Sequence, residues 1–249
     1  MNQLIRAELL KVRTTRPAFW TVVGLPVAVA VAVSSAIASA GRSGGGFPLE
    51  TVEGVRNVLG ASSSGAIIAL ILGILAMSGE YRHHTVTQTF LVTPLRHRVV
   101  AAKFAAFALV GLVLAVAASA LTLAIALPWL ASAGAHVRVV HDVGLVFLGA
   151  TAGTVLYGAL GVAVGALIRN QAAAIVVVLV WMMVIENVFV GLLPALGRWL
   201  PGGAASALTS FSVQAGDLLP MWAAVLVLAA YAAGFAVAGS RLVVERDVA

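Results

Sequence analysis

Few residues in this sequence are of the types that carry out catalysis or bind nucleotides. The 249 residues include no cysteine and two lysines, Lys11 and Lys103. Neither lysine lies in the G-x-x-x-x-G-K-[ST] loop that binds nucleotide phosphates, because Val12 and Phe104 follow them. No combination of nucleophile, general base and orienting group suits hydrolysis. The sequence therefore predicts that the chain is not an enzyme, and that any ATP driving it is bound, with its Mg²⁺, by another chain.

Three histidines share one polar stretch and raise the question of a metal site. His83, His84 and His97 lie between Gly79 and Lys103, where Glu80 is the one carboxylate. Structural metal sites need three or four converging ligands, and thiolates are missing here. Solvated loop histidines are the interpretation we favour, so we predict no metal and no bound cofactor.

Glu186 is the one acidic residue inside an otherwise apolar stretch, IVVVLVWMMVIENVF. A carboxylate in the hydrocarbon region costs a few kcal/mol unless it is paired or hydrated. It could line a substrate path or an outer gate. It could also hold the following segment in place by a hydrogen bond or ion pair, for example with Arg198. Both interpretations stay open, and the second is preferred.

The elements around these residues are those of an integral membrane protein. The chain is 61% hydrophobic and 10% charged, and its mean hydropathy is +1.07. Apolar stretches of about 20 residues are long enough to cross the bilayer as helices. We predict one all-α transmembrane domain, residues 1–249, with six membrane-spanning helices at about 17–40, 58–78, 101–128, 143–168, 171–190 and 220–239.

Two further segments are expected to lie at the membrane surfaces. Residues 1–16 place Ile5, Leu9 and Val12 on one helical face among basic residues, which predicts an interfacial helix. Residues 191–219 are apolar but broken by prolines and glycines. Broken backbone at membrane depth must be covered by protein or water, so we expect short re-entrant helices in the outer leaflet.

Four glycines recur at multiples of four residues in the fourth predicted span: Gly149, Gly153, Gly161 and Gly165. Such a stripe lets another helix approach closely. Packing against other helices of the same chain is the preferred interpretation of this stripe, and contact between two copies of the chain is the alternative.

The longest polar interruption, Gly79 to Lys103, carries four of the fifteen Lys and Arg residues. With both termini inside, eleven of the fifteen are cytoplasmic, and the remaining four are Arg42, Arg56, Arg138 and Arg198. Lys and Arg near span ends favour the cytoplasmic side. We therefore predict a multi-pass protein of the cell membrane with cytoplasmic termini. Topology also explains the net charge of +6 without nucleic acid as a partner.

In the polar stretch from Gly79 to Lys103, Glu80 is expected to pair with Arg6 or Arg13, or with another protein.

The same loop resembles that of small permease subunits of ABC-2 type ABC transporters. The residues that match are Glu80-Tyr81-Arg82-His83, Thr85, Thr87, Thr89-Phe90-Leu91, Thr93-Pro94, Arg96, Arg98-Val99 and Ala102-Lys103. Further matches are Glu8 to Lys11, Arg13 to Arg16, Trp181, Glu186-Asn187 and Arg198 to Gly203. His84 stands where a glycine is frequent in the family.

This resemblance implies a six-span subunit whose loop 79–100 forms a cytoplasmic coupling helix in a groove of a separate ABC ATPase. Two permease chains, identical or sister, and two ATPase chains would form the transporter, usually an exporter. The residues implied in coupling are Glu80, Tyr81, Arg82, His83, Thr85 and Thr89. Glu186 and Asn187 are the candidates for a translocation path or outer gate.

Two other classes of function remain as alternatives. One is a secondary transporter or channel that needs no ATPase. Such proteins often carry internal repeats and paired charges at mid-membrane, neither of which is evident here. The other is a membrane anchor or sensor subunit that transports nothing.

Overall fold

The computed structural model describes residues 2–41, 47–82, 96–135, 143–168, 170–209 and 218–246, without the side chains of residues 18, 81, 82, 96, 97 and 240–246. All the elements described are helices. In chain order they are α1 (Asn2–Thr14), α2 (Arg16–Ser39), α3 (Val52–Leu59), η1 (Gly60–Ser64), α4 (Gly65–Arg82), α6 (Arg96–Ser132), α7 (Gly144–Leu167), α8 (Gln171–Val180), η3 (Trp181–Ile185), α9 (Glu186–Leu192), α10 (Pro194–Gly197), α11 (Pro201–Thr209) and α12 (Met221–Arg246).

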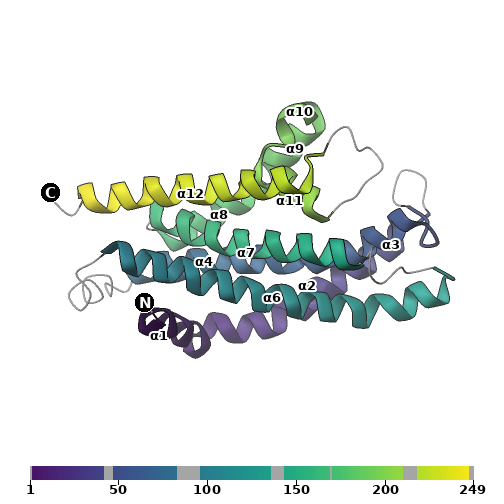
Figure 1. Ribbon diagram of the computed structural model, residues 1–249, viewed down its shortest axis with the longest axis horizontal. Helices are drawn as coiled ribbons and strands as arrows, with labels where there is room; N and C mark the ends of the chain where they lie inside the picture. Colours follow the sequence, from purple (N-terminus) through teal and green to yellow (C-terminus); the bar gives the residue numbers. More distant parts are fainter. Residues whose placement is uncertain are drawn as a thin grey trace.

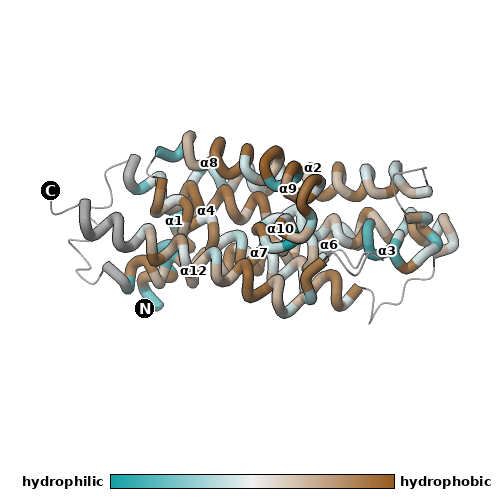
Figure 2. The backbone as a smooth tube through the Cα atoms, turned by 90° about the horizontal axis from the view of Figure 1, so that it is seen from above, coloured by the Kyte–Doolittle hydropathy of each residue, from teal (hydrophilic) through white to brown (hydrophobic). Residues whose placement is uncertain are grey.

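Six stretches of helix are long and apolar enough to cross a membrane, which confirms the predicted all-α membrane fold. They are Phe19–Ser39, Val52–Glu80, Arg98–Ser132, Gly144–Leu167, Gln171–Leu192 and Met221–Gly239. Their helices run side by side along the long axis of an elongated bundle (Figure 1). Apolar residues cover much of the outside of the bundle, especially along α8 (Figure 2), as expected where lipid is the solvent.

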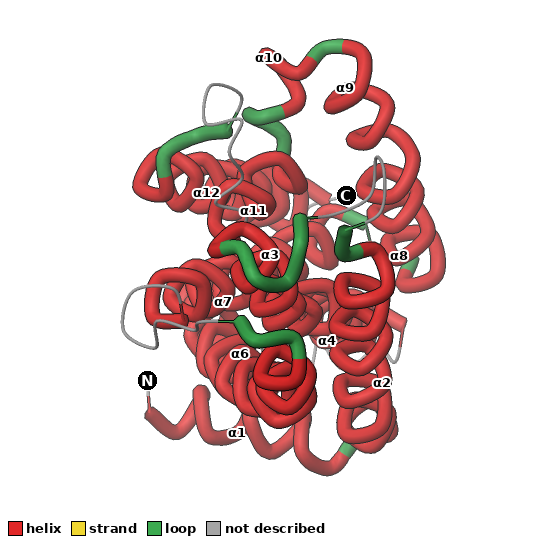
Figure 3. Tube along the Cα trace, turned by 90° about the vertical axis from the view of Figure 1, so that its right-hand side faces the viewer, coloured by secondary structure: helices red, strands yellow, loops and turns green. Residues whose placement is uncertain are grey.

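The N-terminal helix differs from the others in direction. α1 lies across one end of the bundle, roughly at right angles to the long helices (Figure 3). Thr15 separates it from α2, and Pro17 stands in the first turn of α2, where its missing N–H leaves no bond unmade. The last turns of α12 reach the same end of the bundle as α1 (Figure 1). α1 and the last turns of α12 thus lie at the same end of the bundle, on opposite sides of it (Figures 1 and 3).

α7 is the central helix of the bundle, packed against α4, α6, α11 and α12. The four predicted glycines make this packing close. A Cβ on Gly149 would overlap the carbonyl of Leu208 in α11, and a Cβ on Gly161 would overlap the carbonyl of Leu70 in α4. Gly165 faces Ile74 of α4, and Gly153 faces Leu208. The stripe therefore contacts helices of its own chain.

Three elements differ from the sequence-based expectation in where they begin or end, or in their helix type. α6 continues through Pro128 to Ser132, because one proline near the end of a long helix removes only a single backbone bond. The second span begins at Val52, where Thr51 accepts a hydrogen bond from the N–H of Gly54 and so caps α3. The fifth span contains a π-helical turn, η3, between α8 and α9.

The glycine packing predicts unequal effects of the same substitution at two positions. Gly161→Ala should lower the free energy of unfolding by roughly 1–3 kcal/mol, because the added methyl group overpacks the α4–α7 contact. Gly24→Ala in α2 meets no atom within 4 Å, so it should be neutral or stabilise by up to about 1 kcal/mol through helix propensity. Thermal unfolding in detergent measures both, and equal melting temperatures would contradict the packing described.

Candidate functional site

The predicted coupling loop is only partly described. His83, Thr85 and Thr89 lie outside the described residues, and Tyr81 and Arg82 are placed in α4 by their backbone alone. What the structure describes is the frame of the loop: the last turn of α4, the first turns of α6, and α1. Glu80 is the one predicted coupling residue with a described side chain.

Four charged side chains from these three helices form a continuous ion network. The Lys103 Nζ lies 2.7 Å from Glu8 Oε2 and 2.7 Å from Glu80 Oε1. The Lys11 Nζ lies 2.7 Å from Glu8 Oε1 and 2.8 Å from the same Glu80 oxygen. Each ammonium group therefore contacts both carboxylates. We call Glu8, Lys11, Glu80 and Lys103 the ion network.

Helix geometry explains how these residues meet. Glu8 and Lys11 are three residues apart and share one face of α1, and Glu8 is the buried residue of that helix. Glu80 lies in the last turn of α4, and Lys103 lies two turns into α6. The network joins residues that are 95 positions apart in the chain, and it fixes α1 to both helices that frame the loop.

Because Lys103 is buried, its ion pairs contribute more to stability than those of Lys11. The Lys103 side chain is 1% exposed and that of Glu8 is 7% exposed, whereas Lys11 is 48% exposed. Removing one partner of a buried pair leaves an uncompensated charge, which costs roughly 3–5 kcal/mol. An exposed pair contributes about 1 kcal/mol or less. Lys103 therefore stabilises the arrangement more than Lys11.

The pKa values of the α1 residues follow from this arrangement. Burial alone would raise the pKa of Glu8, but the charges and hydrogen bonds of Lys103 and Lys11 outweigh it and lower that pKa. Burial likewise opposes the charge on Lys11, yet its bonds to Glu8 and Glu80 raise the pKa of Lys11. Both shifts favour the ionised network near neutral pH.

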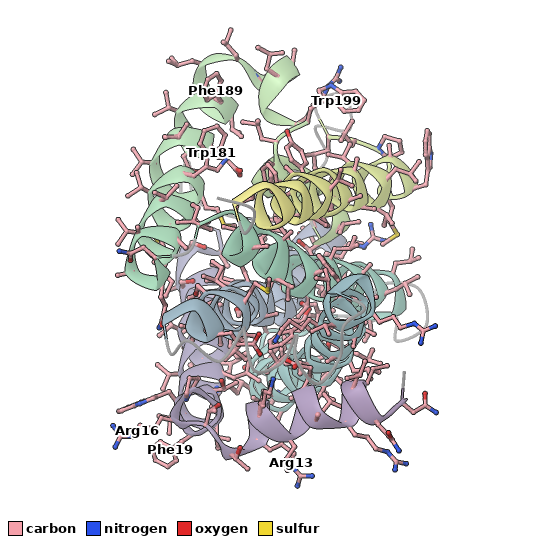
Figure 4. All side chains as sticks on the ribbon, turned by 90° about the vertical axis from the view of Figure 1, so that its left-hand side faces the viewer. Arg13, Arg16, Phe19, Trp181, Phe189 and Trp199 are labelled. Carbon is pink, nitrogen blue, oxygen red and sulfur yellow. The ribbon has the colours of Figure 1, made fainter. Side chains whose placement is uncertain are left out.

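The prediction that Glu80 pairs with Arg6 or Arg13 is wrong, while its contact with another protein stays a prediction. The partners of Glu80 are Lys11 and Lys103, not Arg6 or Arg13, because Glu8 and Lys11 occupy the face of α1 that meets the bundle. Arg6 and Arg13 are exposed on other faces, and Arg13 projects away from the bundle, as does Arg16 (Figure 4). Sequence reasoning missed Glu8 and Lys103 as members. A lysine at the start of an apolar span was the available signal.

Glu186 belongs to a second cluster of hydrogen-bonded residues, which is remote from α1. Its Oε1 accepts a hydrogen bond of 2.8 Å from the indole Nε1 of Trp181, and its Oε2 accepts one of 2.6 Å from the backbone N–H of Gly202. The ion pair with Arg198 suggested by the sequence is absent among the described residues. A Cβ at position 202 would overlap Oε2, so glycine lets the backbone donor approach the carboxylate.

Asn187 bonds to the π-helical turn instead of facing a partner helix. Its amide nitrogen donates to the carbonyls of Met182 and Met183, at 3.3 and 2.9 Å. A π turn shifts the backbone pairing from i−4 to i−5, here from Glu186 N–H to Trp181 carbonyl. Asn187 therefore adds two side-chain hydrogen bonds to the carbonyls of this turn.

A cavity of about 380 Å³ lies beside Glu186, between α4, α7, η3, α9, α10 and α11. Its polar lining includes Tyr157, Glu186, Arg198 and Thr209, and its apolar lining includes Ile67 and Val190. Trp181 and Trp199, which flank this region, lie on the side of the molecule opposite to α1 (Figure 4). The cavity and the ion network are thus separate sites.

The two lysines of the ion network should differ in their effect on stability. We expect Lys103→Ala to lower the free energy of unfolding by roughly 3–5 kcal/mol, because it leaves Glu8 buried without its main partner. Lys11→Ala should cost about 1 kcal/mol or less. Chemical denaturation of the two purified variants compares them, and an equal loss in both would show that burial does not set the strength of the network.

The lowered pKa of Glu8 predicts an acid-sensitive contribution to stability. A carboxyl group whose pKa is lower in the folded state stabilises fully above its unfolded pKa, about 4.3 for glutamate, and the contribution disappears as pH falls through the folded value. Glu8→Gln should therefore flatten the fall in stability below about pH 4.3. Melting temperatures from pH 7 to pH 3 test this, with Glu50→Gln as an exposed control; parallel curves would contradict it.

Comparison with known proteins agrees with this architecture. A family model described as ABC-2 family transporter protein matches residues 4–186, which is more than half of the chain and includes α1, the loop and Glu186. A comparison with curated proteins finds no match. Six apolar helices, a helix across one end and a family match over most of the sequence lead to one conclusion: the chain belongs to the ABC-2 family of transporter proteins.

Proposed function

We propose that this chain is the membrane-spanning subunit of an ATP-driven exporter, and that a separate ABC ATPase drives it through loop 79–100. The observation that carries the proposal is the ion network, which fixes the two helices framing the loop to α1 through buried charges. A force applied to the loop would therefore move α1, α4 and α6 together. That is what a mechanical coupling between two proteins requires.

The same arrangement supports a proposed orientation of the chain in the membrane. The network, α1 and the end of α12 lie at one end of the bundle (Figure 1), and most Lys and Arg residues of the sequence are expected at this end. In the proposal this end faces the cytoplasm, where ATP is available, and the chain resides in the cell membrane. A second permease chain, identical or sister, and two ATPase chains complete the transporter.

α6 is the element that would carry the motion across the bilayer. It is one continuous helix of 37 residues, about 55 Å long at 1.5 Å per residue. Lys103 joins its cytoplasmic turns to the network, and its length packs against α7. Closing of the ATPase dimer would push the loop, tilt α6 and shift the bundle between inward-facing and outward-facing states. Cargo affinity that differs between these states gives the transport its direction.

Substitutions in the loop should lower ATP hydrolysis and transport together. We expect Thr85→Pro and Glu80→Ala to reduce ATPase activity and export by the reconstituted complex at least tenfold. The first disrupts the loop where the ATPase binds, and the second removes the carboxylate that both lysines share. Glu50→Ala, which removes an exposed carboxylate at the other end of the bundle, should leave both activities unchanged.

The complex is obtained by purifying the tagged chain from its native membrane and identifying the nucleotide-binding subunit that accompanies it. Melting temperatures of all variants separate a coupling defect from loss of fold. Wild-type turnover and export in both loop variants would remove the coupling proposal. Export by the purified chain with no nucleotide-binding subunit would instead favour a secondary transporter or channel.

A further inference from the structure

The cavity beside Glu186 contains two opposite charges that are not paired with each other. The Glu186 side chain is buried, and both of its hydrogen-bond donors, Trp181 and Gly202, are neutral. In the described part of the chain, no Lys, Arg or His nitrogen lies within 4.0 Å of its carboxylate. Both carboxyl oxygens accept hydrogen bonds, and no cation among the described residues compensates the charge that the group carries when it is ionised.

Arg198 supplies the opposite charge on another wall of the same cavity. It follows α10, and its Nε is buried without a hydrogen-bond partner. The described contact of its guanidinium group is with Trp199. The Cζ of Arg198 lies 5.9 Å from the centroid of the Trp199 ring. A cation–π contact of this kind uses the face of the ring and leaves the N–H groups of the guanidinium free to bind a planar or tetrahedral anion.

Tyr157 carries a second polar atom in the cavity that lacks a hydrogen-bond partner, after the Nε of Arg198. It lies in α7, its side chain is 1% exposed, and its hydroxyl has no hydrogen-bond partner. A buried polar group left unpaired costs about 1–3 kcal/mol, so these two groups, on the same cavity as the Glu186 carboxyl, indicate a ligand that completes them. The remaining lining includes Ile67, Met182 and Val190, which suit an apolar portion of that ligand.

We propose that this cavity binds a zwitterionic aminoalkyl phosphate or carboxylate group attached to an apolar chain. The protonated amine of the ligand contacts Glu186, and its acidic group contacts Arg198 and the Tyr157 hydroxyl. The volume of about 380 Å³ is at the lower end for small-molecule sites, which fits a head group and the first part of a chain. Binding here requires no ATPase, so the inference stands apart from the proposed function.

The matching of charges is what discriminates among ligands. A ligand with an amine but no acid leaves Arg198 uncompensated and faces its repulsion. A ligand with an acid but no amine leaves Glu186 unpaired and adds a second negative charge. A hydrophobic molecule of the same size satisfies neither residue. Only a ligand with both charges compensates the cavity.

Equilibrium binding of lysolipids to the purified chain in dodecyl maltoside tests the proposal. We expect radiolabelled lysophosphatidylethanolamine to bind saturably with one site per chain. Lysophosphatidylglycerol, which lacks the amine, and dodecylamine, which lacks the acid, should bind at least tenfold more weakly. Free phosphoethanolamine identifies the source: if it binds as tightly, a soluble zwitterion suffices, and if it does not, the ligand is a lipid.

Variants with matched controls assign the site. Glu186→Gln and Arg198→Gln should each weaken lysophosphatidylethanolamine binding at least tenfold, while Glu50→Gln and Arg6→Gln remove exposed charges elsewhere and should leave it unchanged. Tyr157→Phe, which keeps the ring, should weaken binding about fivefold, as expected for one neutral hydrogen bond. Should Glu186→Gln fail to fold, Ser206→Phe keeps both charges and fills the cavity from α11, and it should abolish binding.

Several results would overturn the proposal. Equal binding of lysophosphatidylglycerol and lysophosphatidylethanolamine would show that the amine is not recognised. Wild-type binding by Ser206→Phe would place the ligand elsewhere. No saturable binding of either zwitterion would remove the site. Because none of these measurements uses ATP, a failure here leaves the coupling proposal unaffected.

Discussion

The Lys103 ammonium group, held between the Glu8 and Glu80 carboxylates, determines how the end of the bundle that contains α1 is arranged. A lysine at the start of an apolar span usually extends its chain to reach water. Lys103 is instead 1% exposed, so its charge is compensated by protein. The compensation comes from two other helices, and neither α1 nor α4 can move away without leaving a buried charge unpaired. α1 thereby becomes part of the bundle instead of a separate surface helix.

A second constraint shapes the body of the bundle, where the solvent is lipid. Helices gain little from burying apolar side chains that lipid would cover equally well, so close packing of backbones has to hold them together. The glycines of α7 provide this packing against α4 and α11. Where the backbone departs from regular helix, at η3, the Asn187 side chain bonds to two of its carbonyls and the Glu186 carboxylate bonds to the indole of Trp181. Polar side chains thus bond to the irregular turn.

Much of the fold could be predicted from the sequence, because local patterns determine it. Apolar stretches of about 20 residues mark the six spans, and Thr15 with Pro17 marks the turn from α1 into α2. The four-residue glycine spacing indicates a close helix contact, although the sequence does not say with which helix. α4 and α11 become its partners only through tertiary packing.

The sites were harder to predict because long-range contacts form them. Glu8 and Lys103 are 95 residues apart, and their pairing depends on how α1 crosses the bundle, which periodicity does not fix. Among the three basic residues of α1, Arg6, Lys11 and Arg13, only the rotation of the helix selects Lys11 for Glu80. The Glu186 partner was equally hidden, since a backbone N–H is present at nearly every residue. Gly202 is recognisable as that partner only once the backbones are seen to approach.

The most direct test of the central claim is to determine on which side of the membrane loop 79–100 lies. The chain has no cysteine, so Thr87→Cys and Glu50→Cys each introduce a single thiol, one in the loop and one near the other end of the bundle. Sealed right-side-out vesicles are treated with a membrane-impermeant maleimide before and after permeabilisation. A cytoplasmic coupling loop predicts labelling of Glu50→Cys in sealed vesicles and of Thr87→Cys only after permeabilisation. Labelling of Thr87→Cys in sealed vesicles would place the loop and the ion network outside the cell, where no ATPase could act on them.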